Sequence, residues 1–174
     1  MEQTNSFQYS IEIVGSCNLR CPSCPVGNMR TREVAKKMIP KELFCEIIDK
    51  IKKEKKVEKP LISLFDWGEP TLHPDLPFFV RYINEASMRP RISSNLNVNA
   101  NFEEILKENP YEFKISLSGF NQDKYKLTHA RGNIDKVKSN MNKLRYLADK
   151  LKIDTKFIVG YHVYKHNLKN EYDE

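Results

Sequence analysis

The chain has 174 residues, of which 40% are hydrophobic and 30% charged, and its formal net charge is +6. This length suits one domain with its own hydrophobic core. No apolar run approaches the roughly 18 residues that a membrane-spanning helix needs, and residues 1–6 do not resemble the start of a secretory signal. The sequence therefore predicts a cytoplasmic protein without a membrane partner.

Short strand-like runs alternate with amphipathic stretches along the chain. The predicted strands cover residues 9–14, 61–66, 91–95, 112–117 and 155–164. The predicted helices begin after Pro40 and near Leu76, Phe102 and Ile134, where apolar residues recur at helical spacing. This alternation favours an α/β fold with parallel strands, either doubly wound or a full or partial barrel, with function at the carboxyl ends of the strands.

The end of the pattern is unusual for such a fold. The sequence contains about five β/α units and no sixth strand, and the polar segment 167–174 has the composition of a loop entering a helix. We therefore expect either an unusually short member of its class or a part of a longer parent chain.

The basic residues concentrate in one segment, residues 50–59, which reads KIKKEKKVEK. Such a charge run is typical of a solvated helix end. The segment has no interleaved aromatic residue on which bases could stack, which argues against single-stranded nucleic acid as a partner.

Three of the four cysteines, Cys17, Cys21 and Cys24, follow the first predicted strand with the spacing C-x3-C-x2-C. In a chain without an export signal, such clustering indicates metal or redox chemistry rather than a disulfide framework. Three thiolates on one loop can bind three corners of a cubane iron–sulfur cluster, which normally has four such ligands. One iron would then keep an open position for a reacting ligand.

Two other interpretations of these cysteines remain open. One is a structural zinc site with Cys45, His73 or His162 as the fourth ligand, although the chain has no second cysteine pair. The other is a set of ordinary cysteines without a ligand. Cys45 lies on an apolar helical stripe beside Phe44 and Ile48 and is expected to be a buried small hydrophobe.

The cysteine loop resembles that of the radical S-adenosylmethionine (SAM) superfamily, in particular its SPASM-type and activating-enzyme-like members. Ser23 stands where the family usually has an aromatic residue. The segment 66–70, DWGEP, is similar to the family's G-G-E-P element, with Trp67 in place of the first glycine. The resemblance implies that Gly68, Glu69 and Pro70 lie against the amino group of SAM.

Further elements of the family follow in the same order along the chain. Asn95 belongs to a Ser/Thr-Asn element on the third strand, and Ser116 and Ser118 belong to an S-x-D-G element on the fourth, where Ser118 replaces the common acid. The resemblance places these residues near SAM. It also suggests Arg131 as a partner of the SAM carboxylate, and the segment around Tyr161 as a contact of the adenine.

The resemblance implies a partial (β/α) barrel in which residues 1–174 form a radical SAM core domain. Its cofactors would be a [4Fe-4S] cluster, bound by the three clustered cysteines as metal ligands and catalytic residues, and SAM. The implied activity is reductive cleavage of SAM to a 5′-deoxyadenosyl radical that abstracts hydrogen from an unknown peptide, protein or small molecule. A low-potential flavodoxin or ferredoxin would supply the electron.

The sequence also allows two alternative functions and suggests several residues that could contact a substrate. The alternatives are a non-catalytic iron–sulfur or zinc scaffold and an RNA-modifying enzyme of the same superfamily. His129 is either a packing residue or a contact of SAM or substrate. The side chains expected to face the substrate are those of Trp67, Asn97, Asn99, Tyr161, His162 and Tyr164.

Overall fold

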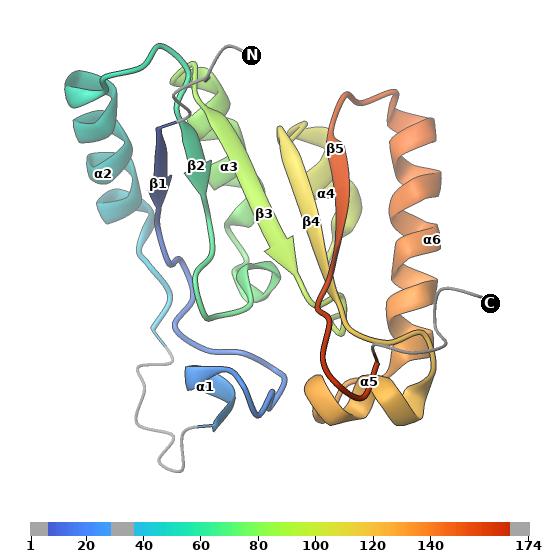
Figure 1. The fold of residues 1–174 in the computed structure, drawn as a ribbon. Helices are drawn as coiled ribbons and strands as arrows, with labels where there is room; N and C mark the ends of the chain where they lie inside the picture. Colours follow the sequence, from blue (N-terminus) through green and yellow to red (C-terminus); the bar gives the residue numbers. More distant parts are fainter. Residues whose placement is uncertain (1–6, 29–36, 168–174) are drawn as a thin grey trace, which may run out of the picture.

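The computed structural model describes residues 7–28 and 37–167, which contain a five-stranded sheet (Figure 1). The strands are β1 (Gln8–Ser10), β2 (Leu61–Ser63), β3 (Arg89–Ser94), β4 (Glu112–Leu117) and β5 (Lys156–Tyr161). They lie in chain order, and each is parallel to its neighbour. The predicted α/β fold with parallel strands is confirmed, and the described residues contain no sixth strand.

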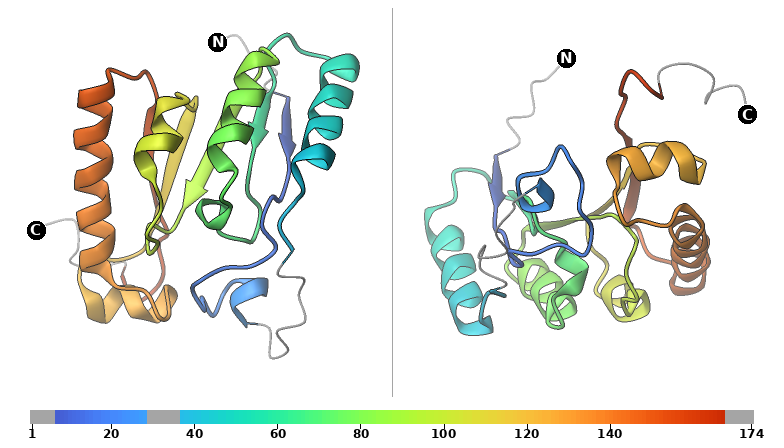
Figure 2. Two further views of the ribbon diagram at one scale, coloured as in Figure 1. Left: turned by 180° about the vertical axis from the view of Figure 1, so that it is seen from behind. Right: turned by 90° about the horizontal axis from the view of Figure 1, so that it is seen from below.

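Four helices cover the same face of this sheet, as the view along the strands in Figure 2 shows. They are α2 (Lys41–Glu54), α3 (Leu76–Glu85), α4 (Phe102–Lys107) and α6 (Ile134–Leu151). A doubly wound fold would place helices on both faces, whereas a barrel has its helices on the outside only. The arrangement is therefore that of an open, partial (β/α) barrel.

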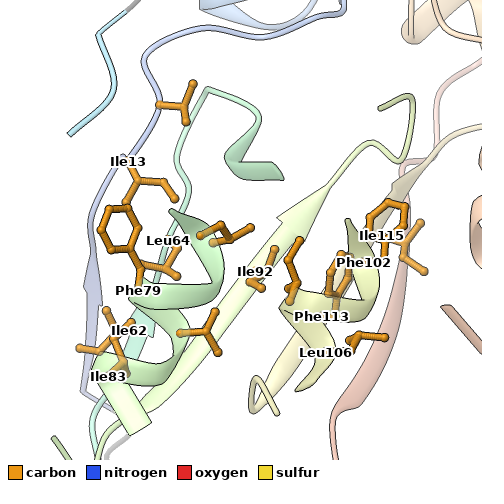
Figure 3. Packing of buried hydrophobic residues seen from close by; sticks show 14 of the residues in the cluster. Ile13, Ile62, Leu64, Phe79, Ile83, Ile92, Phe102, Leu106, Phe113 and Ile115 are labelled. Carbon is orange, nitrogen blue, oxygen red and sulfur yellow. The ribbon is translucent and has the colours of Figure 1, made fainter. Parts of the chain in front are cut away.

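The core fills the space between the helices and the sheet (Figure 3). Ile92 and Phe113 point from β3 and β4 toward the helices and are fully buried. Phe79 of α3 belongs to the same buried cluster and stacks on Phe44 of α2 at a centroid distance of 4.0 Å. Phe113 lies instead against Phe102 of α4. Because side chains alternate along a strand, Ser93 and Ser116 point to the opposite, concave face.

Three asparagines begin the helices that follow β3 and β4. Asn101, Asn121 and Asn133 each accept a hydrogen bond from the backbone N–H three residues later, at the starts of α4, α5 (Gln122–Thr128) and α6. This capping supplies partners for helix N–H groups that have none within the helix.

The structure differs from the expected elements mainly at strand ends. The first strand ends at Ser10 instead of residue 14, and Val14 forms an antiparallel bridge with Met38. The second ends at Ser63, and the fifth ends at Tyr161. Helix α5 and the short α1 (Pro25–Asn28) were not predicted, because their sequences show no clear periodic apolar stripe.

Two other expectations concern the helices and the end of the chain. Cys45 is only half-buried on α2, so the expectation of a buried hydrophobe is wrong in degree. Of the loop expected over 167–174, Asn167 is described and fully buried, and residues 168–174 lie outside the described residues. No helix in the described ranges has the length and apolar character needed to cross a bilayer.

Candidate cofactor site

A cavity of about 300 Å³ lies at the carboxyl ends of the strands, on the concave side of the sheet. It receives residues from the loop after β1, from the segment between β2 and the 3-10 turn η1 (Pro70–Leu72), from the ends of β3 and β4, and from the segment after β5. The lining residues are Cys17, Cys21, Ser23, Cys24, Phe65, Asp66, Trp67, Gly68, Glu69, Ser93, Ser94, Asn95, Ser116, Thr128, His129, His162 and Tyr164.

The three clustered cysteines lie together at this cavity, each half-buried. Their loop is anchored by the buried Leu19 and by a backbone hydrogen bond from Arg20 N–H to Ala130 O (3.0 Å). A turn closed by Cys24 N–H and Cys21 O (3.1 Å) then leads into α1. The loop thus turns all three thiols toward the same space.

Hydrogen-bond donors surround the sulfur of Cys17. The backbone N–H of Leu19 lies 3.4 Å from Sγ, and the side-chain amide of Asn95 lies 3.6 Å from it. Asn95 also donates to the side-chain oxygen of Asn18 (3.0 Å), which joins the cysteine loop to the end of β3. Such donors stabilise a thiolate when a metal binds it.

A negative charge on one of these thiols disfavours ionisation of its neighbours. Burial raises the pKa of Cys17 and of Cys21 to about 11, and the neighbouring thiols add to this effect. Three adjacent thiolates therefore need a cation between them. No group of three or more His, Cys, Asp or Glu side chains in the described ranges is arranged to hold a single metal ion.

Two of the three residues considered as a fourth zinc ligand, His73 and Cys45, lie away from these cysteines. His73 lies against Phe79, and its Nε2 is 3.0 Å from the backbone oxygen of Ile39. Neither His73 nor Cys45 lines the cavity, whereas His162 does.

Glu69 joins the ends of β2 and β3 beneath the cavity. Its buried carboxylate accepts hydrogen bonds from the backbone N–H of Asn95 (2.9 Å) and from the backbone N–H (3.2 Å) and hydroxyl of Thr71. Burial raises the pKa of this carboxyl group. The preceding segment is fixed by Glu12, whose Oε1 accepts from the N–H groups of Trp67 and Gly68, both at 2.9 Å.

The cavity also holds a histidine that packs deeply into the fold. His129 is 6% exposed, and its ring stacks on that of Tyr125 with a centroid distance of 4.6 Å and an interplanar angle of 7°. Its Nδ1 lies 2.7 Å from Oγ of the fully buried Ser118. Burial lowers the pKa of His129 to about 4, with a smaller contribution from His162, so the ring is neutral at physiological pH.

The model of the radical SAM superfamily matches residues 11–164. The chain belongs to the radical SAM superfamily. The predicted resemblance is thereby confirmed, and the cofactors of this superfamily are SAM and a [4Fe-4S] cluster. Membership supports enzyme activity and does not determine the class of reaction.

Solved structures of radical SAM enzymes have the same fold. SuiB from Streptococcus suis, bound to the precursor peptide SuiA, is 20% identical with a TM-score of 0.67, over 97% of this chain and 36% of SuiB. anSMEcpe with bound AdoMet and the Cp18Cys peptide is 16% identical (TM-score 0.64), over 88% of this chain and 42% of the other. BtrN in complex with AdoMet and 2-DOIA is 19% identical (TM-score 0.59), over 91% and 58%.

These identities establish a shared fold and no more. The chain spans between 36% and 58% of the length of the three proteins. No curated protein matches the chain.

The residues that the radical SAM resemblance suggested are partly brought together. Those that line the cavity are the three cysteines, Gly68, Glu69, Asn95 and Ser116. Pro70 is buried at the start of η1, and Ser118 is buried beneath His129. Tyr161 stacks on Phe120 (5.4 Å between centroids), and Arg131 is exposed with a φ of 71°; both lie outside the described lining residues.

Of the side chains expected to face a substrate, some line the cavity and others do not. Trp67, His162 and Tyr164 line the cavity. Asn97 instead donates to the hydroxyl of Tyr125 (2.7 Å), and Asn99 is exposed on the surface outside the lining set.

Some lining residues were not predicted as site residues. Ser93 lies 3.5 Å from Ser116 across β3 and β4, and it could have been found by extending the alternation of β3 to the concave face. Thr128, at the end of α5, reaches the cavity beside Ser118, which follows β4, and the sequence carries no signal for that contact.

Proposed function

We propose that this protein is a radical SAM enzyme in which Cys17, Cys21 and Cys24 bind three irons of a [4Fe-4S] cluster and the adjoining cavity binds SAM. The observation that supports this best is the common position of the three thiols: all of them line one cavity together with the strand-end residues Gly68, Glu69 and Asn95. The site thus combines soft metal ligands with polar groups that suit a zwitterionic nucleoside.

The residues present fit these cofactors chemically. A cluster needs thiolate ligands, and Cys17 has two hydrogen-bond donors on its sulfur that would stabilise the thiolate. The cavity of about 300 Å³ lies at the lower end of the range for small-molecule sites.

The bound cofactors would supply an electron and a carbon-centred radical that removes a hydrogen atom from the substrate. The protein's own contribution is to position and enclose them. Glu69 holds the end of β3, so that the amide of Asn95 reaches Cys17. Trp67, 50% exposed at the edge of the cavity, is placed to contact whatever enters.

The substrate proposal remains a peptide, a protein or a small molecule. The similar structures contain examples of both kinds, since SuiB and anSMEcpe are bound to peptides and BtrN is bound to 2-DOIA. A flavodoxin or ferredoxin is the proposed electron donor, and the net charge of +6 favours docking of an acidic carrier. Rates of reduction by an acidic flavodoxin should then fall as the ionic strength rises.

The proposal is tested by reconstituting the protein anaerobically and measuring 5′-deoxyadenosine formed from SAM with dithionite. Cys21→Ala should reduce the product to background, whereas Cys45→Ala, at the half-buried cysteine of α2, should retain turnover. Retained turnover in Cys21→Ala would refute the ligand assignment. A colourless protein loaded with zinc, or a loaded protein that never cleaves SAM, would favour a scaffold instead.

A further inference from the structure

Four groups form a hydrogen-bonded chain behind the cavity: the ring of His129, the hydroxyls of Ser118 and Thr128, and the backbone carbonyl of Tyr125. His129 Nδ1 lies 2.7 Å from Ser118 Oγ, Ser118 Oγ is hydrogen-bonded to Thr128 Oγ1, and Thr128 Oγ1 lies 3.2 Å from Tyr125 O. Ser118 is fully buried, and Thr128 and His129 are each 6% exposed. The proposed function gives no role to this series of hydrogen bonds.

The donor-to-acceptor direction of these hydrogen bonds follows from the last group in the series, the carbonyl of Tyr125. Thr128 Oγ1 lies 3.2 Å from both Tyr125 O and His129 Nδ1. A carbonyl oxygen can only accept, so all of these contacts contain a proton only if the Thr128 hydroxyl donates to Tyr125 O and the imidazole donates toward the two hydroxyl oxygens. Thr128 Oγ1 then accepts a hydrogen bond from Ser118, whose hydroxyl donates its single proton to it. The Ser118 oxygen is left as the acceptor for His129 Nδ1, which must therefore carry a proton.

This direction fixes the tautomer of His129. A neutral imidazole carries one proton, and here it lies on Nδ1, so Nε2 has a free lone pair. A charged ring would carry a proton on both nitrogens, but burial holds the pKa of His129 near 4. Nε2 is thus a hydrogen-bond acceptor at physiological pH.

The position of the ring is fixed as well as its protonation. Tyr125 stacks on one face of the ring, and Ser118 holds Nδ1. In the described part of the chain, the hydrogen bonds of this ring are made by Nδ1, and the residue lines the cavity. Nε2 is therefore the ring nitrogen available to a molecule bound there.

We propose that His129 is a specificity-determining residue of the cavity, whose Nε2 accepts a hydrogen bond from a hydroxyl group of the bound molecule. This inference rests on the proposed function for the identity of the cavity. A free lone pair on a neutral ring nitrogen accepts from a neutral O–H donor, and a hydroxyl group supplies one. The hydroxyl belongs either to the ribose of a nucleoside or to a polyol substrate.

The first experiment reads the tautomer directly in the anaerobically reconstituted full chain labelled with 15N-histidine. The chain has four histidines, and His129→Gln identifies the resonances of His129. We expect a protonated Nδ1 and an unprotonated Nε2 at neutral pH. The exposed His166 serves as the control and should show both tautomers. Ser118→Ala should shift His129 toward such a mixture. A protonated Nε2 in the native chain would overturn the proposal.

The second experiment adds adenosine, 2′,3′-dideoxyadenosine or myo-inositol to the same sample. A ribose source predicts that adenosine moves the Nε2 resonance and the dideoxy nucleoside does not. A polyol source predicts a shift with myo-inositol alone. If no hydroxyl compound moves Nε2, or if the dideoxy nucleoside moves it as much as adenosine does, the proposal is wrong.

The affinity for SAM separates the two sources further. With a ribose source, His129→Leu should weaken SAM binding about tenfold, the equivalent of one hydrogen bond. His129→Gln, which can place its amide oxygen near the position of Nε2, should restore most of this affinity. With a polyol source, neither variant changes it. These readings do not require turnover, so they can succeed or fail independently of the test for SAM cleavage.

Discussion

Gly68 lies so close to the backbone of Val14 that a Cβ atom at position 68 would meet the Val14 carbonyl oxygen at 1.7 Å. The contact brings the start of the cysteine loop against the segment that follows β2. A hydrogen bond from Glu69 N–H to Ser16 O (2.9 Å) joins the same two segments. The position of the thiols relative to Glu69 therefore depends on the missing side chain of Gly68.

We expect Gly68→Ala to destabilise the fold by about 3 kcal/mol or more, because backbone atoms on both sides would have to move. The matched control is Gly160→Ala, where the added Cβ would meet Lys114 Cε, on a flexible side chain, at 2.5 Å. That variant should stay within about 1 kcal/mol of the native protein. Urea unfolding at equal m-values measures both, and equal stability of the two variants would contradict this account.

Removal of the Glu69 carboxylate should also be costly. In Glu69→Ala the backbone N–H groups of Thr71 and Asn95 lose their acceptor in a buried setting, at about 1–3 kcal/mol for each group. Glu69→Gln keeps one oxygen at the same place and should lose less. Thermal unfolding of the two variants tests this order, and a more stable alanine variant would show that the carboxylate does not connect the strands.

The buried histidine predicts a dependence of stability on pH. Because the pKa of His129 is lowered from 6.5 to about 4, the unfolded chain binds a proton that the folded chain excludes between these values. Stability should therefore fall by up to about 3 kcal/mol as the pH decreases from 6.5 to 4. The free energy of unfolding, measured at several pH values, checks this sign.

Variants separate this contribution from those of the other histidines. His129→Gln should flatten most of the slope, whereas His166→Gln, at an exposed site, should leave it unchanged. A remaining slope is expected from His73 and His162, because burial lowers the pKa of both. An unaltered slope in His129→Gln would show that this residue is not the main source.

An ion pair between neighbouring strands gives a further test. Arg91 of β3 and Glu112 of β4 are in register, with Arg91 Nε 2.7 Å from Glu112 Oε1, and the glutamate side chain is 7% exposed. Arg91→Met would leave a buried carboxylate without its partner, which costs about 3–5 kcal/mol. The double variant Arg91→Met/Glu112→Gln should recover much of this loss in urea unfolding. No recovery would mean that Arg91 acts through packing alone.

The sequence predicted the elements and positions that depend on local pattern. The C-x3-C-x2-C loop and the motif residues Gly68, Glu69 and Asn95 are found at strand ends, because parallel strands all present these ends at one edge. The strand over residues 112–117 is found with its predicted bounds, since its apolar residues are closed off by Gly119.

What the sequence could not predict depends on contacts between distant segments. Ser118, just after β4, and Thr128, at the end of α5, are hydrogen-bonded, and the local sequence around neither residue predicts this contact. Val14, beyond the end of the first strand, pairs with Met38, 24 positions away. Such pairings are decided by the packed fold and not by local preference.

The chain contains a single tryptophan, and the structure places it at the edge of the cavity, with its backbone oxygen 3.9 Å from Cys24 Sγ. The tryptophan fluorescence of the protein therefore originates beside the proposed reaction centre alone. Iron–sulfur clusters absorb visible light, so an assembled cluster there would quench this emission. Arrival of the cluster, and then of its ligand, could thus be followed in real time without any added label.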